Sequence, residues 1–345
     1  MKVLTVVGAR PQFIKAAVLR QLFPQHGIEE ILVHTGQHYD YEMSQVFFDE
    51  LSMKPPEYFI ELTERGHGGM TGEILARCEQ ILLEEKPDVC LVYGDTNSTI
   101  AGALAAAKIH IPVCHVEAGL RSFNKKMPEE INRILTDHMS ALLFCSTFAA
   151  VENLKNENIT HGVHHVGDIM YDSVKMFTDI SAAEELISQY VTNDKPHALM
   201  TVHRQSTVGS DEILTQVMDY CKRFSEQYSI IFPAHPRTAS RIKELGLDLG
   251  SINMIEPLSY KSMQALLATS SLLITDSGGL QKEAYFHKVR CITLRDETEW
   301  VETIEAGWNR LWQDEDYICD PRDITEYGMG DSAEKMIEII LQHFK

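Results

Sequence analysis

Short apolar runs rich in β-branched residues alternate with longer helical patterns along most of this 345-residue chain. The alternation limits the possible folds most strongly, because repeated β-α steps with buried strands build parallel sheets covered by helices. Helices are predicted over residues 11–23, 71–85, 98–108 and 333–344. Strands are predicted over residues 3–7, 31–34, 89–93, 113–117, 142–145, 198–202, 230–233, 254–255, 272–275 and 290–294.

The predicted strands fall into two sets separated by the polar segment 162–168. Two sets of this size favour two doubly wound, Rossmann-like α/β domains over a single one. We expect an N-terminal domain over residues 1–168, a C-terminal domain over 169–331 and a closing helix over 332–345.

Composition excludes several classes of partner. The chain has 31 basic and 50 acidic residues, a formal net charge of −19 that repels nucleic acids and anionic membrane surfaces. No apolar stretch approaches the roughly 20 residues of a spanning helix, and the start lacks a signal peptide, so we expect a cytoplasmic protein. The seven cysteines are scattered and form no CxxC pair, and the histidines show no ligand spacing, so neither disulfides nor a metal site is predicted.

Ligands of open parallel sheets bind beyond the carboxyl ends of the strands, which directs attention to the residues that follow each predicted strand. The first strand is followed by GARPQFIK at 8–15, which matches neither the dinucleotide-binding glycine motif nor a P-loop. Arg10 and Lys15 can nevertheless meet an anion there. The alternative is that both are exposed cations at the start of a helix.

Three carboxylates follow the next strands. Asp95 and Glu117 come directly after predicted strands, and Glu129 begins a helix in which Arg133 and Asp137 share its face. An acidic residue also suits a helix N-terminus for structural reasons. Carboxylates that converge in one site shift one another's pKa values and thereby supply an acid and a base at neutral pH.

The segment TDSGGLQKEA at 275–284 indicates an anion site. An apolar strand leads into Ser277-Gly278-Gly279 and a helix, whose N-terminal N–H groups and dipole favour a diphosphate. Glu283, one turn later, is placed to bind ribose hydroxyls. Ser277 as a plain helix cap is the alternative. His203 and His235 follow two other strands and add donors.

Six ordered motifs resemble the non-hydrolysing UDP-N-acetylglucosamine 2-epimerases: GARPQFIK, HTGQHYD at 34–40, YGDTNST at 93–99, HVEAGLRS at 115–122, MPEEINR at 127–133 and TDSGGLQKEA. The resemblance implies a glycosyltransferase-B type fold, in which two Rossmann-like domains face a cleft and the C-terminal helix returns to the first domain. It also implies a homodimer that needs no cofactor, with a UDP-sugar as substrate and UDP held during the reaction.

The resemblance further implies the roles of individual residues. Asp95, Glu117 and Glu129 would be the catalytic acid and base carboxylates, assisted by His203. Arg10, Lys15, His203 and Ser277 to Gly279 would hold the diphosphate, and Glu283 the ribose. Further substrate contacts are expected from Gln37, His38, Arg121, Arg133, His235, Pro257, Tyr260, Asp276, Gln281 and Arg295.

The expected reaction explains this choice of residues. The hydrogen at sugar C2 is not next to a carbonyl, so its direct removal is too costly. Elimination of UDP across C1 and C2 by a carboxylate gives a 2-acetamidoglucal, and UDP then adds back with protonation on the opposite face. Donors that stabilise the departing diphosphate, and exclusion of water, are required.

Three motifs depart from the family pattern. The usual HRREN is HRQST at 203–207, the usual RxxTERPE is RDETEWVE at 295–302, and GQHRE becomes GQHYD at 36–40. Such variants resemble the branch that acts on UDP-2,3-diacetamido-2,3-dideoxyglucuronate. This sugar nucleotide is therefore an alternative substrate. The residues also leave open a glycosyltransferase of the same architecture, a hydrolysing epimerase and a sugar-nucleotide sensor.

Overall fold

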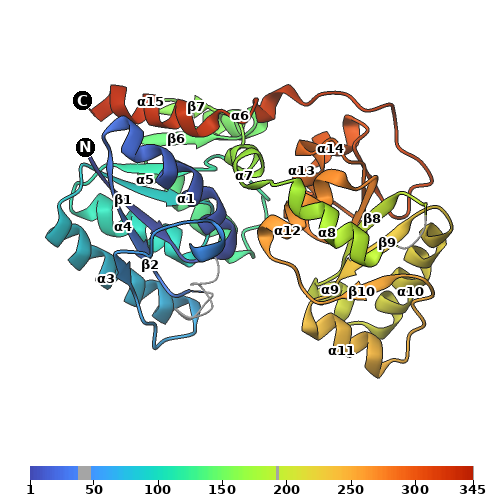
Figure 1. The fold of residues 1–345 in the computed structure, drawn as a ribbon. Coiled ribbons are helices and arrows are strands. Elements are labelled where there is room, and N and C mark those ends of the chain that lie inside the picture. The colour runs from blue at the N-terminus through green and yellow to red at the C-terminus, as the bar shows by residue number, and fades with distance from the viewer. Residues whose placement is uncertain (38–47, 192–193, 345) are drawn as a thin grey trace. The chain divides into compact units, whose positions relative to one another are not determined.

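The computed structural model describes residues 1–37, 48–191 and 194–344. The chain divides into two compact units (Figure 1). Unit 1 comprises Met1–Met176 and Thr325–Lys345, and unit 2 comprises Phe177–Ile324. Each unit contains one parallel sheet with helices packed against it, which confirms the predicted α/β class.

The sheet of unit 1 has the strand order β3-β2-β1-β4-β5-β6-β7, with all pairs parallel. Its interior strands are almost wholly apolar, as expected for strands covered on both faces. The strands are β1 (Lys2–Val7), β2 (Glu29–His34), β3 (Tyr58–Phe59), β4 (Val89–Tyr93), β5 (Val113–Val116), β6 (Leu142–Cys145) and β7 (Val163–His165).

The helices of unit 1 include those predicted over residues 11–23, 71–85, 98–108 and 333–344. They are α1 (Arg10–Leu22), the 3₁₀ turn η1 (Phe23–His26), α3 (His67–Glu85), α4 (Asn97–Lys108), α5 (Pro128–Met139), α6 (Phe148–Asn156), α7 (Ile169–Phe177), the 3₁₀ turn η3 (Thr325–Tyr327) and α15 (Ser332–Phe344). Pro11 in the first turn of α1 and Pro128 in that of α5 suit positions that need no backbone N–H donor.

The sheet of unit 2 repeats this topology with the order β10-β9-β8-β11-β12-β13. Its strands are β8 (His197–Thr201), β9 (Ser229–Pro233), β10 (Asn253–Ile255), β11 (Leu272–Thr275), β12 (Cys291–Thr293) and β13 (Asn309–Leu311). Its helices are α8 (Ser181–Tyr190), α9 (Gln205–Val208), α10 (Asp211–Lys222), the 3₁₀ turn η2 (Arg223–Glu226), α11 (Pro236–Glu244), α12 (Tyr260–Thr269), α13 (Gly278–Phe286) and α14 (Val301–Glu305).

Both sheets reverse their strand order once, between β1 and β4 in unit 1 and between β8 and β11 in unit 2. Connections leave a sheet in opposite directions at such a switch point, which opens a crevice at the carboxyl ends of the two strands. The residues that follow β1, β4, β8 and β11 are therefore the first place to look for a site.

The limits of unit 1 differ from the expected boundary at residue 168. Helix α7 continues unit 1 to Met176, because Ser173 is buried there and its Oγ donates to the Ile14 carbonyl of α1 at 3.3 Å. Residues 325–331, which we expected in the second domain, also belong to unit 1. There the Tyr327 carbonyl accepts from the Asp168 backbone N–H at 3.0 Å.

Helix α15 returns the end of the chain to unit 1, beside α1 (Figure 1). Met336, Ile337 and Ile340 are buried in the core. The Asp172 carboxylate of α7 accepts hydrogen bonds from the first backbone N–H groups of α15, which fixes the start of the helix. Unit 1 is thus built from both ends of the chain.

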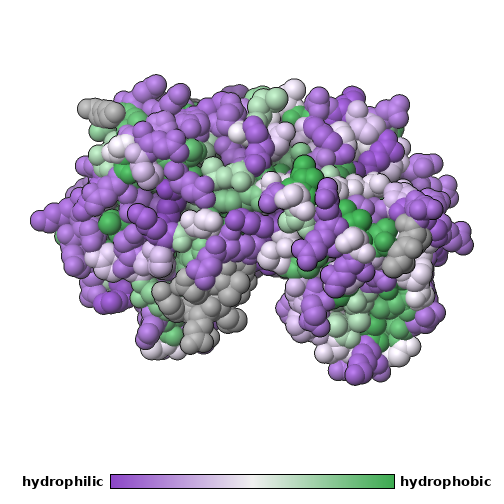
Figure 2. Space-filling view, viewed as in Figure 1, coloured by the Kyte–Doolittle hydropathy of each residue, from purple (hydrophilic) through white to green (hydrophobic). Residues whose placement is uncertain are grey.

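Polar residues cover much of the surface in view (Figure 2), in keeping with the chain's high content of acidic side chains. In the described ranges, six of the seven cysteines are buried thiols and Cys319 is partly exposed, and none forms a disulfide. No helix among the described residues is long and apolar enough to cross a membrane.

Candidate active site

Glu117 directly follows β5, and its backbone lies in the left-handed region with a φ of 69°. This conformation is uncommon for a residue with a side chain and persists where its surroundings enforce it. The Phe144 carbonyl accepts from the backbone N–H groups of Glu117 and Ala118, at 3.0 and 3.1 Å. The Lys15 ammonium donates to the Glu117 carboxylate, and both side chains are only 10% exposed.

Asp95 lies in the turn between β4 and α4, beside two residues of α5. Arg133 donates to its carboxylate, and the Asn132 side chain donates to its backbone carbonyl at 2.9 Å. Burial raises the pKa of the Asp95 carboxyl and the charge of Glu117 adds to this, so that the pKa stays above its usual value although Arg133 opposes the shift. A carboxyl with a raised pKa is suited to exchange protons with a substrate.

The first turn of α5 contains two adjacent glutamates in different environments. Glu129 is exposed, and its charge is among the causes that raise the pKa of Asp95, so the two lie within electrostatic range. Glu130 is 1% exposed and accepts from the Ser122 N–H and hydroxyl and from the Phe123 N–H, at 2.8 to 2.9 Å. Glu130 therefore holds the preceding loop, and Glu129 is the one available to a substrate.

The turn after β1 is fastened to the end of β4 by Gln12, a residue that we did not single out from the sequence. Its Oε1 accepts from the Gly8 and Ala9 backbone N–H groups at 2.8 and 3.1 Å, and its Nε2 donates to the Tyr93 carbonyl at 2.6 Å. A Cβ at Gly8 would lie 2.1 Å from the Ser98 hydroxyl, so only glycine fits. The only sequence signal for Gln12 was its place inside the GARPQFIK motif.

Of the other binding candidates in unit 1, Arg10 is the first residue of α1 and is partly exposed. The Gln37 Oε1 accepts from the backbone N–H and the hydroxyl of Ser98 at 2.9 and 2.6 Å, which joins the turn after β2 to α4. His38 lies outside the described residues. Arg10 and Gln37 therefore stand near the switch point of unit 1, where β1 and β4 end.

Arg121 takes a different place from the substrate contact that we expected. Its side chain is 1% exposed. It donates to the Asp137 carboxylate at 2.7 Å and to both carboxylate oxygens of Glu157 at 2.7 and 2.8 Å. Because these carboxylates engage the buried guanidinium, Arg121 is a structural support of the site.

In unit 2, Asp276 follows β11 and is fully buried. Its carboxylate accepts from the backbone N–H groups of His203 and Arg204 at 2.9 to 3.1 Å, and the His203 Nδ1 lies 3.2 Å from Oδ1. Burial by itself raises the pKa of Asp276, but the His203 ring and these N–H donors outweigh it and hold the pKa below its usual value. Asp276 thus fixes the turn after β8, while the side chain of His203 remains 49% exposed.

Helix α13 starts at the switch point of unit 2 with an open N-terminus. Ser277 is its N-cap residue, yet the serine side chain makes no capping hydrogen bond, so the plain-cap alternative is not supported. A Cβ at Gly279 would meet no atom within 4 Å. The first turn of this nine-residue helix is thus uncapped by a side chain and has free space beside Gly279, and such a helix start favours an anion.

Two guanidinium groups flank this helix start. A Cβ at Gly278 would lie 3.4 Å from Arg204 Nη2. Glu299 accepts from Arg295 at 2.7 Å and from Arg204 at 3.5 Å, so it holds both near the same turn. The sequence indicated Arg204 as a cationic group at the end of the strand over 198–202, directly after His203, although it assigned no substrate contact to it.

Trp300 anchors the neighbouring loop to the first turn of α13. Its indole N–H donates to the Gly278 carbonyl at 2.9 Å, and the Lys282 ammonium lies 3.9 Å from the ring centroid. This tryptophan belongs to the TEW variant of the family motif, so the variant residue contacts the helix start directly.

Two candidates on α13 point inward. Gln281 is 1% exposed, and its amide oxygen accepts from Thr298 and from Asn309, the latter at 3.1 Å, so it is a packing residue and not the substrate contact we expected. Glu283 is 6% exposed and accepts from the Gln264 amide at 2.6 Å. A ligand would reach the Glu283 carboxylate only at its accessible edge.

The remaining candidates of unit 2 lie at the starts of two helices. His235 is exposed and caps α11, where its Nδ1 accepts from the Arg237 N–H at 3.3 Å. Pro257 is exposed in the loop before α12, and Tyr260, the first residue of α12, is 4% exposed. Within the described ranges, no group of three or more histidine, cysteine or acidic residues is arranged to hold a metal ion.

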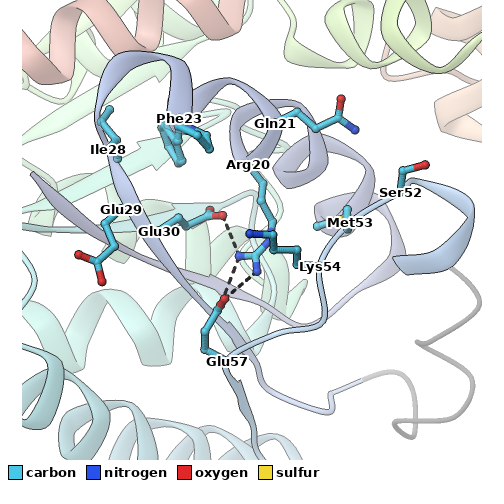
Figure 3. Close-up of a pocket in the computed structure, with 11 residues that line it drawn as sticks. Arg20, Gln21, Phe23, Ile28, Glu29, Glu30, Ser52, Met53, Lys54 and Glu57 are labelled. Atoms are coloured by element: carbon cyan, nitrogen blue, oxygen red, sulfur yellow. Dashed lines mark hydrogen bonds and ion pairs between the residues drawn. The ribbon is translucent and has the colours of Figure 1, made fainter.

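A pocket of about 500 Å³ lies elsewhere in unit 1, at the opposite end of the sheet from Asp95 and Glu117 (Figure 3). Arg20 of α1 reaches into it between Glu30 at the start of β2 and Glu57, and it donates to each at 2.9 Å. These ion pairs join α1 to the start of β2 and to the segment before β3. They lie at the amino-terminal ends of the strands, away from the switch point.

Unit 1 thus places carboxylates at the carboxyl ends of its strands, and unit 2 places guanidinium groups beside a helix start, which suits acid–base chemistry and the binding of an anion. The UDP-N-acetylglucosamine 2-epimerase family model matches residues 20–341. A UDP-N-acetylglucosamine 2-epimerase homolog of Methanococcus maripaludis is 45% identical over 357 residues, with 99% of each chain covered. This chain belongs to that family and is a UDP-sugar 2-epimerase, an isomerase.

Two further relatives bear on the substrate and the fold. The UDP-2,3-diacetamido-2,3-dideoxy-D-glucuronate 2-epimerase of Pseudomonas aeruginosa is 46% identical over 317 residues, 90% of this chain and 88% of that one. The solved UDP-GlcNAc 2-epimerase of Methanocaldococcus jannaschii has a TM-score of 0.86 and 36% identity, covering 99% of this chain and 100% of that one. The fold is therefore that of the glycosyltransferase-B-like epimerases.

Proposed function

We propose that this enzyme interconverts UDP-N-acetylglucosamine (UDP-GlcNAc) and UDP-N-acetylmannosamine. The observation that carries the proposal is the carboxylate cluster of unit 1, in which Asp95 has a raised pKa, Glu117 is paired with Lys15, and Glu129 is exposed nearby. A structure of the Methanocaldococcus jannaschii relative that holds UDP-GlcNAc and UDP, at 37% identity and a TM-score of 0.83, supports the choice of substrate.

The proposed chemistry is elimination and re-addition. One carboxylate removes the C2 proton while the C1–O bond breaks, and the bonding electrons leave with UDP. The resulting 2-acetamidoglucal then takes UDP back at C1 and a proton at C2 from the opposite face, so that no atom is gained or lost. Asp95 and Glu117 are the proton carriers favoured by burial and pairing, and Glu129 completes the cluster.

Unit 2 would hold the nucleotide during this interval. The start of α13 and two nearby side chains, the His203 imidazole and the Arg204 guanidinium, are placed to stabilise a diphosphate leaving group. Glu283 would accept ribose hydroxyls. In unit 1, Arg10 and Lys15 would add positive charge for the substrate.

The second candidate substrate is UDP-2,3-diacetamido-2,3-dideoxyglucuronate. The Pseudomonas aeruginosa relative with that name is 46% identical to this chain, and the TEW variant places Trp300 against the Gly278 carbonyl. This sugar carries an extra carboxylate, for which a cation such as Arg295 would be needed.

We also propose that the enzyme is a homodimer. Helix α5 exposes an apolar stripe at four-residue spacing, formed by its N-cap Met127 and by Ile131 and Leu135, which are 38%, 47% and 49% exposed, and Phe123 nearby is 78% exposed. A second copy of the same acidic chain, meeting this stripe about a twofold axis, would bury it. Light scattering of I131E/L135E against wild type tests this, since a lasting dimer would contradict the placement.

Proton NMR of the protein with UDP-GlcNAc in D2O tests the function. We expect UDP-N-acetylmannosamine with deuterium at C2 and no accumulation of UDP. D95N should lose this exchange, whereas E152Q, which alters an exposed ion pair on α6, should keep it. Net release of UDP with free sugar would refute the proposal in favour of a hydrolysing enzyme, and turnover of the diacetamido-uronate alone would replace the substrate.

A further inference from the structure

His115 of β5 is a fully buried histidine whose two ring nitrogens bridge different parts of unit 1. Nδ1 lies 2.7 Å from Oδ1 of Asp137 in α5, and Nε2 lies 2.7 Å from the carbonyl oxygen of Gly94 after β4. Each ring nitrogen therefore has a polar partner within hydrogen-bond distance. A buried polar side chain in an otherwise apolar strand needs such partners to offset its desolvation.

Asp137 extends the bridge to the segment after β5. Its other oxygen accepts from the Gly119 backbone N–H at 3.1 Å and from Arg121 at 2.7 Å. Burial by itself raises the pKa of Asp137, but His115 and Arg121 outweigh it and hold the pKa below its usual value, in keeping with an ionised carboxylate. Arg121 also donates to the Glu157 carboxylate, which extends the network of hydrogen bonds to that residue.

The pair of His115 and Asp137, called the bridge below, joins the three segments that contain the proposed catalytic carboxylates. Asp95 directly follows Gly94, whose carbonyl His115 holds. Glu117 lies between His115 and Gly119, both of which contact Asp137. Glu129 sits on the same helix as Asp137. The β4–β5 ladder is already closed by backbone hydrogen bonds, so the sheet does not need His115 for its pairing.

We propose that His115, through Asp137, is a positioning residue that fixes the spacing of the three carboxylates for proton transfer. The inference rests on the proposed function, because it assigns those carboxylates their role. His115 itself does not touch the substrate. Its effect follows from geometry, since a misplacement of about 1 Å in a catalytic group can lower a rate about a hundredfold.

Three substitutions separate the two contacts. In H115N the side-chain amide can still donate from the Nδ1 position to Asp137, but not reach Gly94. In H115Q the amide can donate from the Nε2 position to the Gly94 carbonyl, but loses Asp137. H115F fills the volume and loses both. We expect kcat to fall about 10- to 100-fold in the single-contact variants and further in H115F.

The Michaelis constant and the affinity for UDP separate positioning from a general loss of structure. UDP would be held by unit 2, which contains none of these contacts, so both values should stay within about threefold of wild type. R20Q is the matched control, because it breaks a buried ion pair of unit 1 at the opposite end of the sheet (Figure 3). It should lower the melting temperature without the fall in kcat.

Amide hydrogen exchange gives a readout independent of turnover, with faster exchange expected at residues 94–97 in H115N and at both 94–97 and 117–119 in H115F. Wild-type kcat in folded H115F, or unchanged exchange at residues 94–97 in H115N, would overturn the inference. A fall in kcat that R20Q reproduces at equal melting temperature would also overturn it. An inactive wild type would refute the proposed function. The exchange data would then still show whether His115 holds the segments at 94–97 and 117–119 in place.

Discussion

Replacing Asp276 with asparagine removes a buried negative charge while keeping the size of the side chain. The carboxylate accepts hydrogen bonds from three donors, namely the backbone N–H groups of His203 and Arg204 and the His203 ring. An amide offers one acceptor oxygen, and its NH₂ group would face at least one of these donors. The loss of one or two hydrogen bonds to a charged group corresponds to about 2 to 4 kcal/mol of unfolding free energy.

The assay for D276N is thermal and urea unfolding, with UDP binding measured by calorimetry. For a unit of this size the expected loss corresponds to about 5 to 15 °C in melting temperature. UDP affinity should fall as well, because the turn that carries His203 and Arg204 is no longer fixed. D219N, which alters an exposed ion pair on α10, is the matched control and should change neither value.

The difference between wild type and D276N should also depend on pH. The pKa of Asp276 is lowered in the folded protein, so its stabilisation is present above the unfolded value of about 4 and is lost as the pH falls through the folded pKa. A loss under about 1 kcal/mol at pH 7, or an undiminished difference at pH 3, would refute this account of the turn.

Three further outcomes are expected. Burial holds the pKa of His34 and of His287 at about 4, so both histidines take up a proton at higher pH in the unfolded chain than in the folded one. The free energy of unfolding should therefore fall by about 3 kcal/mol for each histidine as the pH is lowered from 6.5 to 4. Urea unfolding of H287Q at several pH values should show a smaller dependence of this free energy on pH. G119A should destabilise unit 1 by about 2 to 4 kcal/mol in thermal melts, because φ is 80° and a Cβ would lie 2.4 Å from the Ala150 carbonyl. I340A should cost about 2 to 5 kcal/mol in unit 1 and leave UDP affinity unchanged in calorimetry.

Strand periodicity predicted the interior of both sheets because those strands are continuous apolar runs. The three strands that the sequence did not reveal are short and lie at sheet edges, where fewer neighbours demand apolar residues. One of them, β7, contains His164 and His165 and fell inside the segment that we interpreted as a polar linker. Such short edge strands depend on tertiary pairing more than on local pattern, although β10, also a three-residue edge strand, was predicted over residues 254–255.

The sequence correctly placed Asp95, Glu117 and the start of α13 just after the ends of strands, since position along a strand can be predicted from the sequence; their roles stay predictions. The direction in which a side chain points cannot be predicted in this way. Arg121 and Gln281 occupy motif positions but turn into the protein, because buried partners from distant segments engage them. His115 stood inside an apolar strand and gave no local sign of its two partners.

The return of α15 to unit 1 has a consequence for synthesis on the ribosome. Unit 2 is a continuous segment and can fold once Ile324 has emerged, whereas the first 176 residues must wait for the last helix to cover α1. Until then the surface that receives Met336, Ile337 and Ile340 is exposed to solvent. Residues 1–176 are therefore made before unit 2 but are covered only after it, and a chain that stalls before α15 is made leaves the carboxylate-bearing unit accessible to chaperones and proteases.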